Sequence, residues 1–214
     1  MKLYTFFRSS AAYRARIALS LKGVAYESVP VHLRRAGGAH RRQDYLDVNP
    51  HGLVPALEVD GSVIGQSLAI IEYLDERWPE PRLLPAEPIA RAHVRGMSLL
   101  VACDIHPLNN LRVLNYLREE LKQPEESTNT WYRYWVAEGF RALETQAARF
   151  SADKKHCYGD QVSVADICLV PQMYNARRFA CDLAPYPTLI AITKHLESIP
   201  AFQAAAPECQ ADAE

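Results

Sequence analysis

Four prolines within ten positions constrain this chain more than any other feature. They are Pro79, Pro81, Pro85 and Pro88. Proline lacks a backbone N–H and clashes with the preceding helical turn, so neither a helix nor a central strand can pass through this segment. Strand and helix patterns alternate before it, and helical patterns alone follow it. We therefore predict a domain at residues 1–80, a linker at residues 81–88 and a second domain at residues 89–214.

The first domain is predicted to contain both strands and helices. Short apolar runs predict strands at residues 2–7, 26–31, 57–59 and 62–65. Asp60-Gly61 separates the last two runs and is typical of a tight hairpin turn. Helices are expected from Ser9 or Ser10 to Gly23, at residues 44–48 and from Ser67 to Trp78. The predicted order is β-α-β-α-β-β-α.

The second domain is predicted to be a helical bundle. Apolar residues recur at helical spacing in residues 89–120, 125–150, 164–181 and 187–196. Ser163 and Asp166 form a capping-box pattern at the start of the third of these helices. The fold class is therefore an α/β domain followed by an all-α bundle.

Composition argues against several classes of protein. Lys+Arg 24 and Asp+Glu 25 leave a formal net charge of −1, which disfavours nucleic acid and anionic membranes as partners. No apolar run approaches the roughly 18 residues of a membrane-spanning helix, and the first residues do not fit a signal peptide. The five cysteines are odd in number and include no C-x-x-C pair, so neither a disulfide framework nor a metal site is expected. We expect a cytoplasmic protein.

Several motifs in a fixed order resemble one family. Arg8-Ser9-Ser10 precedes the helical sequence RARIAL at residues 14–19. Further motifs are Asn49-Pro50, Val54-Pro55, Gln66-Ser67, Ile105-His106-Pro107, Val170-Pro171-Gln172 and Arg178-Phe179. Together with the domain order, they resemble the zeta class of the soluble glutathione S-transferases over almost the whole chain. The resemblance implies a thioredoxin-like first domain.

That class contains maleylacetoacetate and maleylpyruvate isomerases. The resemblance therefore implies a glutathione-dependent cis–trans isomerase of a maleyl diketo acid in aromatic compound degradation. In such a reaction the glutathione thiolate adds to the cis double bond, the new single bond rotates, and the thiolate leaves to give the trans product. Glutathione is regenerated, so no metal or redox partner is required. The alternatives are a broader glutathione transferase or dehalogenase, and a non-catalytic interaction module.

The thiol of glutathione needs a group that stabilises its anion, because a free thiol has a pKa of about 8.5. Ser9 or Ser10 can donate an O–H at the helix N-terminus, where backbone N–H groups also favour an anion. From the residues alone, each serine is explained more simply as a helix cap. The class motif selects Ser9, with Ser10 in reserve. Ala11 replaces the class cysteine, so this helix offers no nucleophilic sulfur.

The resemblance also assigns residues to glutathione. Val54, before a cis Pro55, is expected to pair its backbone with the cysteinyl part. Gln66 and Ser67 are expected to bind the γ-glutamyl carboxylate at a helix N-terminus, although Ser67 alone would be read as a cap. The remaining positions are His51, Asp104 and Asn110. The family forms homodimers, which would bring Asp104 towards the glutathione of the partner subunit.

The small acidic substrate needs cations, and arginine is the residue that best pairs with a carboxylate. Arg8 follows the first strand beside the expected thiolate, whereas Arg112 and Arg178 lie on predicted bundle helices. Arg177 competes with Arg178 for this role. His106 either faces the same site or occupies a buried kink before Pro107.

Overall fold

A computed structural model describes residues 1–214, apart from the side chain of residue 36. The chain divides into two units. Met1–Arg82 and Ser198–Glu214 form the first unit, and Leu83–Glu197 forms the second. The structure thus differs from the expectation that all of residues 89–214 form one helical domain, because the C-terminal segment packs with the N-terminal residues.

A mixed four-stranded sheet lies at the centre of the first unit. Its strands are β1 (Lys2–Thr5), β2 (Glu27–Pro30), β3 (Ala56–Val59) and β4 (Ser62–Gly65), in the order β2-β1-β3-β4. β1 runs parallel to β2 and antiparallel to β3, and β3 runs antiparallel to β4. Pro30 ends the edge strand, where a missing N–H is tolerated. Asp60 and Gly61 both have positive φ, as the predicted hairpin turn requires.

The helices α1 (Ser10–Leu21) and α3 (Ser67–Arg77) pack against the sheet and bury its apolar residues. The short helix α2 (Gln43–Leu46) and the 3-10 turns η1 (Arg35–Gly37) and η2 (Ala39–Arg41) lie in the connection between β2 and β3. Ile17 on α1 and Leu74 on α3 are fully buried, as are Leu3 and Leu57 of the sheet. These side chains form the core that holds the ends of the strands in place.

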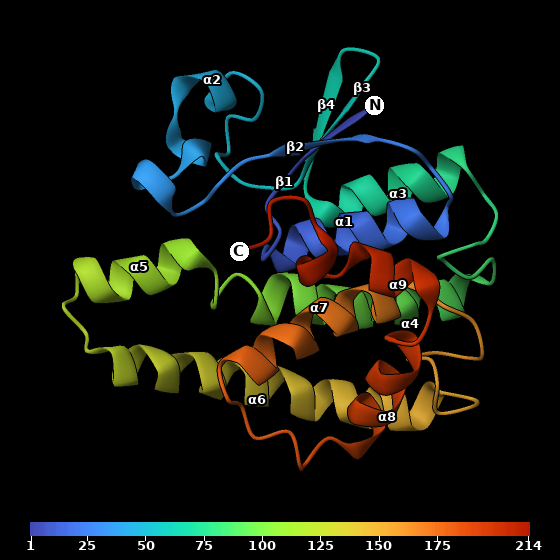
Figure 1. The fold of residues 1–214 in the computed structure, drawn as a ribbon. Coiled ribbons are helices and arrows are strands. Elements are labelled where there is room, and N and C mark those ends of the chain that lie inside the picture. The colour runs from blue at the N-terminus through green and yellow to red at the C-terminus, as the bar shows by residue number, and fades with distance from the viewer. The chain divides into compact units, whose positions relative to one another are not determined.

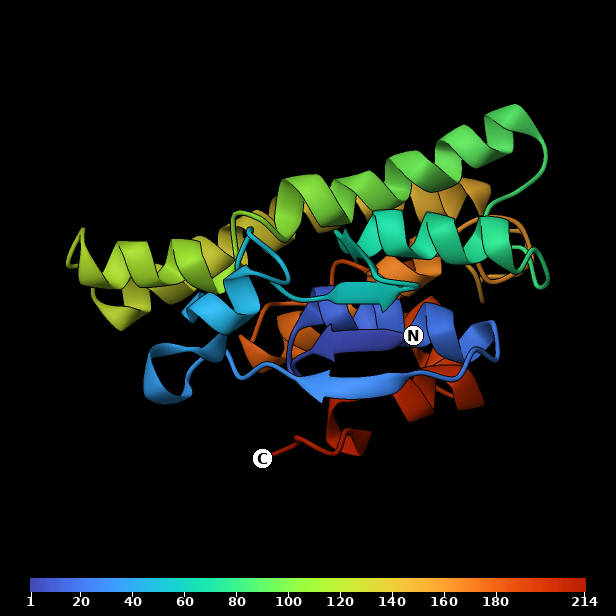
Figure 2. The same ribbon diagram turned by 90° about the horizontal axis from the view of Figure 1, so that it is seen from above.

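The C-terminal segment completes the first unit. It contains α9 (Pro200–Ala205) and the turn η4 (Pro207–Cys209). α1 packs against both α3 and α9, and Figures 1 and 2 show α1 between these two helices. The Tyr13 hydroxyl donates to the Phe202 carbonyl at 3.4 Å, and Arg16 Nε donates to the Ala205 carbonyl at 3.0 Å. The Phe202 side chain is fully buried, which explains why this segment belongs with the first unit.

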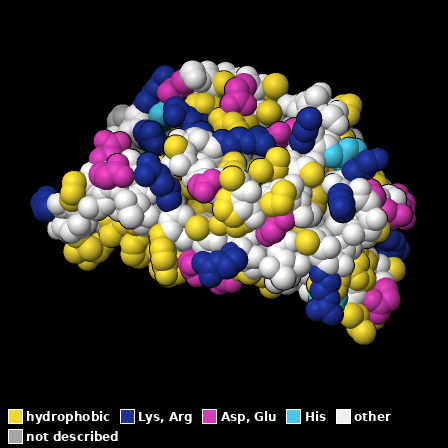
Figure 3. Space-filling model, turned by 90° about the horizontal axis from the view of Figure 1, so that it is seen from below, with side chains coloured by type: hydrophobic (Ala, Val, Ile, Leu, Met, Phe, Trp, Pro, Cys, Tyr) yellow, Lys and Arg dark blue, Asp and Glu magenta, His cyan; other side chains and the backbone are white. Residues whose placement is uncertain are grey.

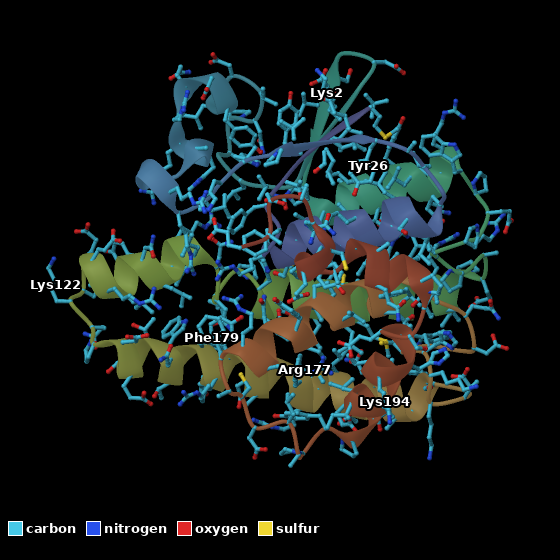
Figure 4. The ribbon with its side chains drawn as sticks, viewed as in Figure 1. Lys2, Tyr26, Lys122, Arg177, Phe179 and Lys194 are labelled. Carbon is cyan, nitrogen blue, oxygen red and sulfur yellow. The ribbon has the colours of Figure 1, made fainter. Side chains whose placement is uncertain are left out.

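The second unit is a helical bundle. Its helices are α4 (Pro88–Leu99), the π-helical segment η3 (Leu100–Ile105), α5 (Leu111–Glu119), α6 (Glu125–Phe150), α7 (Val164–Arg178) and α8 (Pro187–Leu196). α5 and α6 run in opposite directions and meet in the connection that contains Lys122 (Figures 1 and 4). The Asp166 carboxylate accepts hydrogen bonds from the Ser163 N–H and hydroxyl, each at 2.8 Å, and fixes the start of α7.

One predicted helix of the bundle is interrupted. Residues 89–120 were expected to be continuous, but the chain leaves the helix after η3 and begins α5 at Leu111. Pro107 has no N–H to continue the helix, and the Asn110 side chain caps α5 by accepting from the Arg112 N–H at 3.1 Å. On α6, a Cβ at Gly139 would lie 2.2 Å from an Ile105 side-chain carbon, so glycine is required where α6 approaches η3.

Candidate active site

Three loops of the first unit meet at one end of its sheet. The register pairs Tyr4 of β1 with Ala56 of β3, and Ala56 with Gly65 of β4. The loop after β1, the loop before β3 and the start of α3 after β4 are therefore neighbours. Val54 shares a buried apolar cluster with Phe6 and Phe7, which places the loop before β3 against the loop after β1. This end of the sheet carries most of the positions that the sequence analysis assigned to glutathione.

Ser9 is the N-cap of α1. Its backbone is extended, with φ −70° and ψ 117°, and its Oγ accepts a hydrogen bond from the Ala12 N–H at 3.2 Å. The Ser9 N–H donates to the Phe6 carbonyl at 2.9 Å, which fixes the turn out of β1. Ser10 is the first helical residue and is buried. Ser9 accepts this hydrogen bond through a lone pair of its oxygen. Its O–H group can therefore still donate a hydrogen bond to an anion at the helix N-terminus.

Arg8 directly precedes Ser9, and its side chain contacts a C-terminal residue of the first unit. Its guanidinium carbon lies 4.7 Å from the centre of the Phe7 ring, and its Nη2 lies 3.6 Å from a Glu214 carboxylate oxygen. Glu214 also contacts His32 Nε2 at 2.8 Å and Arg35 at 2.6 Å. The hydrogen bond from His32 and the neighbouring arginine charges lower the pKa of Glu214 below its usual range. Arg8 thus lies in a part of the surface that already holds a carboxylate.

The N-terminus of α3 presents backbone groups that no side chain caps. Gln66 is exposed and has a φ of +66°, a conformation that costs energy for a residue other than glycine. Its side chain makes no capping hydrogen bond to the first turn of α3. Ser67 begins the helix and is buried, and its Oγ accepts a hydrogen bond from Arg14 Nη1 at 3.4 Å. The first N–H groups of α3 are therefore suited to a carboxylate.

The loop before β3 is held through one carbonyl group. Tyr45 Oη donates to the Leu53 carbonyl at 2.6 Å, and Asn49 Nδ2 donates to the same oxygen at 2.7 Å. Burial raises the pKa of Tyr45 to about 12, which keeps its donor proton in place. The next peptide bond, Val54–Pro55, is cis, as the resemblance implied. Among the described residues, no hydrogen bond uses the Val54 N–H or carbonyl, so both groups are available to an extended ligand.

His51 lies in the same loop and is exposed. Its backbone N–H donates to Asn49 Oδ1 at 3.2 Å. Its imidazole is therefore on the surface of the first unit, close in sequence to the Val54 backbone.

The other predicted site residues belong to the second unit. Asp104 is exposed on η3, and Arg112 is exposed on the first turn of α5. The Asn110 side chain caps α5, and its Nδ2 lies 3.4 Å from His106 Nε2. His106 is half-buried at the end of η3. Asp104, His106, Asn110 and Arg112 thus follow one another at the break between η3 and α5.

Arg177 and Arg178 end α7, and Figure 4 labels Arg177 together with Phe179. Arg177 Nη1 makes an ion pair with Glu197 at 2.5 Å. Arg178 instead donates to Asn175 Oδ1 at 3.2 Å, and among the described residues it has no ion pair. Its guanidinium lies 5.6 Å from the Phe179 ring, which stacks on Tyr132 of α6. Arg178 is therefore the better placed of the two to bind an external carboxylate.

The charged side chains on the face shown in Figure 3 are of both signs, with Lys and Arg interspersed among Asp and Glu. This distribution agrees with the formal net charge of −1. Within the described residues, no helix is both long and apolar enough to cross a membrane.

Comparison with known proteins identifies the first unit. A family model described as the glutathione S-transferase N-terminal domain matches residues 8–77. A probable maleylacetoacetate isomerase of Vibrio cholerae is 49% identical over 212 residues, which cover 99% of this chain and 97% of that protein. The chain therefore belongs to the glutathione S-transferase family. Within the family it groups with the zeta class.

Solved structures support the same assignment. One is the holo structure of maleyl pyruvate isomerase, a bacterial glutathione S-transferase of the zeta class, with 44% identity, full coverage of both chains and a TM-score of 0.95. Another is maleylacetoacetate isomerase from Anaeromyxobacter dehalogenans with bound dicarboxyethyl glutathione and citrate. It is 40% identical, with a TM-score of 0.86 and coverage of 100% of this chain and 97% of that chain. The predicted thioredoxin-like domain with a helical bundle is confirmed as this family's fold.

The sequence analysis did not identify the residues whose hydrogen bonds hold the site residues in place. Tyr45 and Asn49 hold the Leu53 carbonyl, and Arg14 reaches Ser67 from α1. A signal for Arg14 was present, because Arg14 and Arg16 interrupt an otherwise apolar helix and are each only 1% exposed. Buried arginines require partners, so this pattern indicates a polar network.

Proposed function

We propose that this chain is a glutathione-dependent cis–trans isomerase of a maleyl diketo acid, either maleylacetoacetate or maleylpyruvate. The observation that carries the proposal is the meeting of Ser9, Val54 and the Gln66–Ser67 segment at one end of the sheet. A cysteine-containing tripeptide requires three features. They are a helix N-terminus that stabilises its thiolate, unpaired backbone groups that pair with its extended backbone, and a second helix N-terminus that binds its carboxylate.

The residues present fit glutathione. The free N–H and carbonyl of Val54 suit its cysteinyl backbone, and the uncapped first turn of α3, with Gln66 and Ser67, suits its γ-glutamyl carboxylate. The His51 side chain is proposed to contact the glycyl end of glutathione. Asp104 and Asn110 stay in the proposal as further glutathione contacts, although Asn110 already caps α5.

Bound glutathione supplies a thiolate that adds reversibly to the cis double bond and leaves after rotation. Ser9 donates a hydrogen bond from its hydroxyl group to this sulfur, and the N-terminus of α1 adds a favourable electrostatic potential. Ser10 is the less suitable donor because it is buried within the first turn. Ala11 provides no sulfur of its own, so the thiol chemistry depends on the bound tripeptide.

The chain's arginines bind the carboxylates of the substrate and stabilise the charge that develops on its carbonyl oxygen. Arg8 is beside Ser9, and its surroundings already accommodate the Glu214 carboxylate. Arg112 and Arg178 are exposed cations of the second unit, and His106 precedes Asn110 by four residues in the break between η3 and α5. A solved relative binds a ligand that joins glutathione to a dicarboxylate, which are the two chemical groups that these residues are proposed to hold.

One comparison of substrates tests the proposal. The turnover of maleylpyruvate, maleylacetoacetate and a chlorinated aryl compound is measured with and without glutathione. We expect the trans product from a maleyl substrate only when glutathione is present, with no net consumption of thiol. Thiol consumption with the aryl halide and no isomerisation would favour the broader transferase or dehalogenase. A failure to bind a glutathione-affinity column would favour the non-catalytic module.

The proposal includes a homodimer in the cytoplasm. The dimer is what the resemblance to the zeta class implies, because the family forms homodimers. The five cysteines are free, in keeping with a reducing compartment. Sedimentation at micromolar protein concentration is expected to give the mass of two chains, and a monomer would contradict the dimer.

A further inference from the structure

The loop that carries Arg8 and Ser9 is held by two side chains, a buried arginine of α1 and a carboxylate that is distant in sequence. Phe6 and Phe7 connect β1 to Arg8, and both are buried. Arg16 lies beneath this loop, within α1. Its Nη2 donates to the Phe7 carbonyl at 2.9 Å, and its Nη1 donates to Thr5 Oγ1 at 3.0 Å and to the Phe6 carbonyl at 3.4 Å. One buried guanidinium thus fixes three consecutive residues.

Asp212 completes this support from the C-terminal segment. Its Oδ2 accepts a hydrogen bond from the Phe7 N–H at 3.0 Å, across 205 positions of the chain. The two polar groups that flank Phe7 are therefore both fixed, the N–H by Asp212 and the carbonyl by Arg16. Burial lowers the pKa of Arg16 to about 10, and the negative charge of Asp212 opposes this shift. The two side chains are coupled through charge as well as through the loop.

We propose that Asp212 is a positioning residue of the active site, which sets the direction of Arg8 and Ser9 by holding the Phe7 N–H. Asp212 is only half-buried and is three residues beyond the end of η4, so it contributes little to the apolar core. Phe7 directly precedes Arg8 and lies two residues before Ser9. A rotation of the peptide group that joins Phe6 to Phe7 would therefore redirect the Arg8 side chain and shift Ser9, the N-cap of α1. The inference rests on the proposed function for its kinetic readouts alone.

The test compares Asp212→Ala, Asp212→Asn and Glu208→Ala in the full chain. Asparagine keeps an oxygen that can accept from Phe7, whereas alanine does not. Glu208 is an exposed acidic residue of the same segment and serves as the control for loss of charge. Three quantities are measured: hydrogen exchange of the Phe7 amide without ligand, the pKa of the bound glutathione thiol by ultraviolet absorbance, and kcat and KM with maleylpyruvate.

For Asp212→Ala we expect Phe7 exchange about tenfold faster, a raised thiol pKa and kcat about tenfold lower, as the loss of one charge-assisted hydrogen bond implies. Asp212→Asn should recover kcat to within about threefold, and Glu208→Ala should match the parent. An unchanged exchange rate and thiol pKa in Asp212→Ala would overturn the inference, as would equal losses in Glu208→Ala or no recovery in Asp212→Asn. If the parent binds glutathione without isomerising maleyl substrates, the proposed function fails, and the amide exchange still tests Asp212.

Discussion

The arginines of α1 in the first unit and those at helix ends of the second unit serve opposite purposes. Arg14 and Arg16 on α1 are almost completely buried and donate to groups of the protein itself. Arg112 and Arg178 of the second unit are exposed at helix ends. The same type of side chain therefore shapes the site from within α1 and remains available to a ligand at these helix ends. Burial and the identity of the hydrogen-bond acceptors, rather than residue type, distinguish the two roles.

The largest effect is expected from removing a buried cation. Arg16→Met leaves the acceptors on Thr5, Phe7 and Ala205 without this donor, and should lower the free energy of unfolding by about 3–5 kcal/mol. Arg177→Met removes a solvent-exposed ion pair and should cost at most about 1 kcal/mol. Urea denaturation of both variants measures the difference. Similar losses would erase the distinction between buried and exposed arginines.

Removing an exposed arginine should affect recognition and leave stability nearly intact. Arg178→Met is expected to lower kcat/KM for maleylpyruvate by about 30- to 1000-fold, or roughly 2–4 kcal/mol, because a substrate carboxylate loses its partner. Arg8→Met should behave similarly on this substrate. Glutathione affinity, measured by calorimetry, should barely change, and Arg177→Met is the matched control. An equal loss with an aryl halide would show that Arg178 does not recognise acid groups.

Ser9→Ala tests the thiolate site with a smaller expected effect. Loss of the hydroxyl donor should raise the pKa of the bound thiol and reduce turnover by roughly 10- to 100-fold, as expected for a hydrogen bond to a charged group. Losing the N-cap should also reduce stability by about 0.5–2 kcal/mol. Titration of the thiolate absorbance measures the pKa, with Ser10→Ala for comparison. An identical midpoint in Ser9→Ala and the parent would remove Ser9 from the mechanism.

The smallest effect concerns Glu214, whose carboxylate competes with acidic substrates for Arg8. Glu214→Gln should lower KM for maleylpyruvate by about two- to fivefold near neutral pH, as for an exposed ion pair. The folded pKa of Glu214 is lowered, so its contacts are present above the ordinary glutamate pKa and are lost as the pH falls through the lowered value. The KM difference should therefore disappear in acid. A KM in Glu214→Gln that equals the parent value at neutral pH would exclude this competition.

The fold could be predicted from local patterns. The alternating elements, the Asp60-Gly61 turn and the bundle helices α6 and α8 leave short-range signals, and the structure contains each of them. The break before α5 was missed because apolar periodicity continues across Pro107. α9 was missed because six residues make less than two turns, and its partners lie on α1, almost the full chain length away.

The positions of the candidate site were predictable to a different extent. Ser9, Val54 and Gln66-Ser67 are carried by motifs, and the sheet register places their segments together. Their chemical roles stay predictions. Asp212, Tyr45 and Asn49 act through hydrogen bonds to individual backbone groups, and such bonds leave no periodic signal in the sequence.

The return of residues 198–214 to the first unit has a consequence for biosynthesis. Translation releases β1 and α1 long before the Ala205 carbonyl and the Asp212 carboxylate that support them. A nascent chain that has reached residue 197 already contains Ser9, Arg8, Val54, Gln66 and Ser67. It still lacks two of the groups that shape the loop beside the thiol. An ordered loop at Arg8 and Ser9 therefore requires that synthesis has passed residue 212.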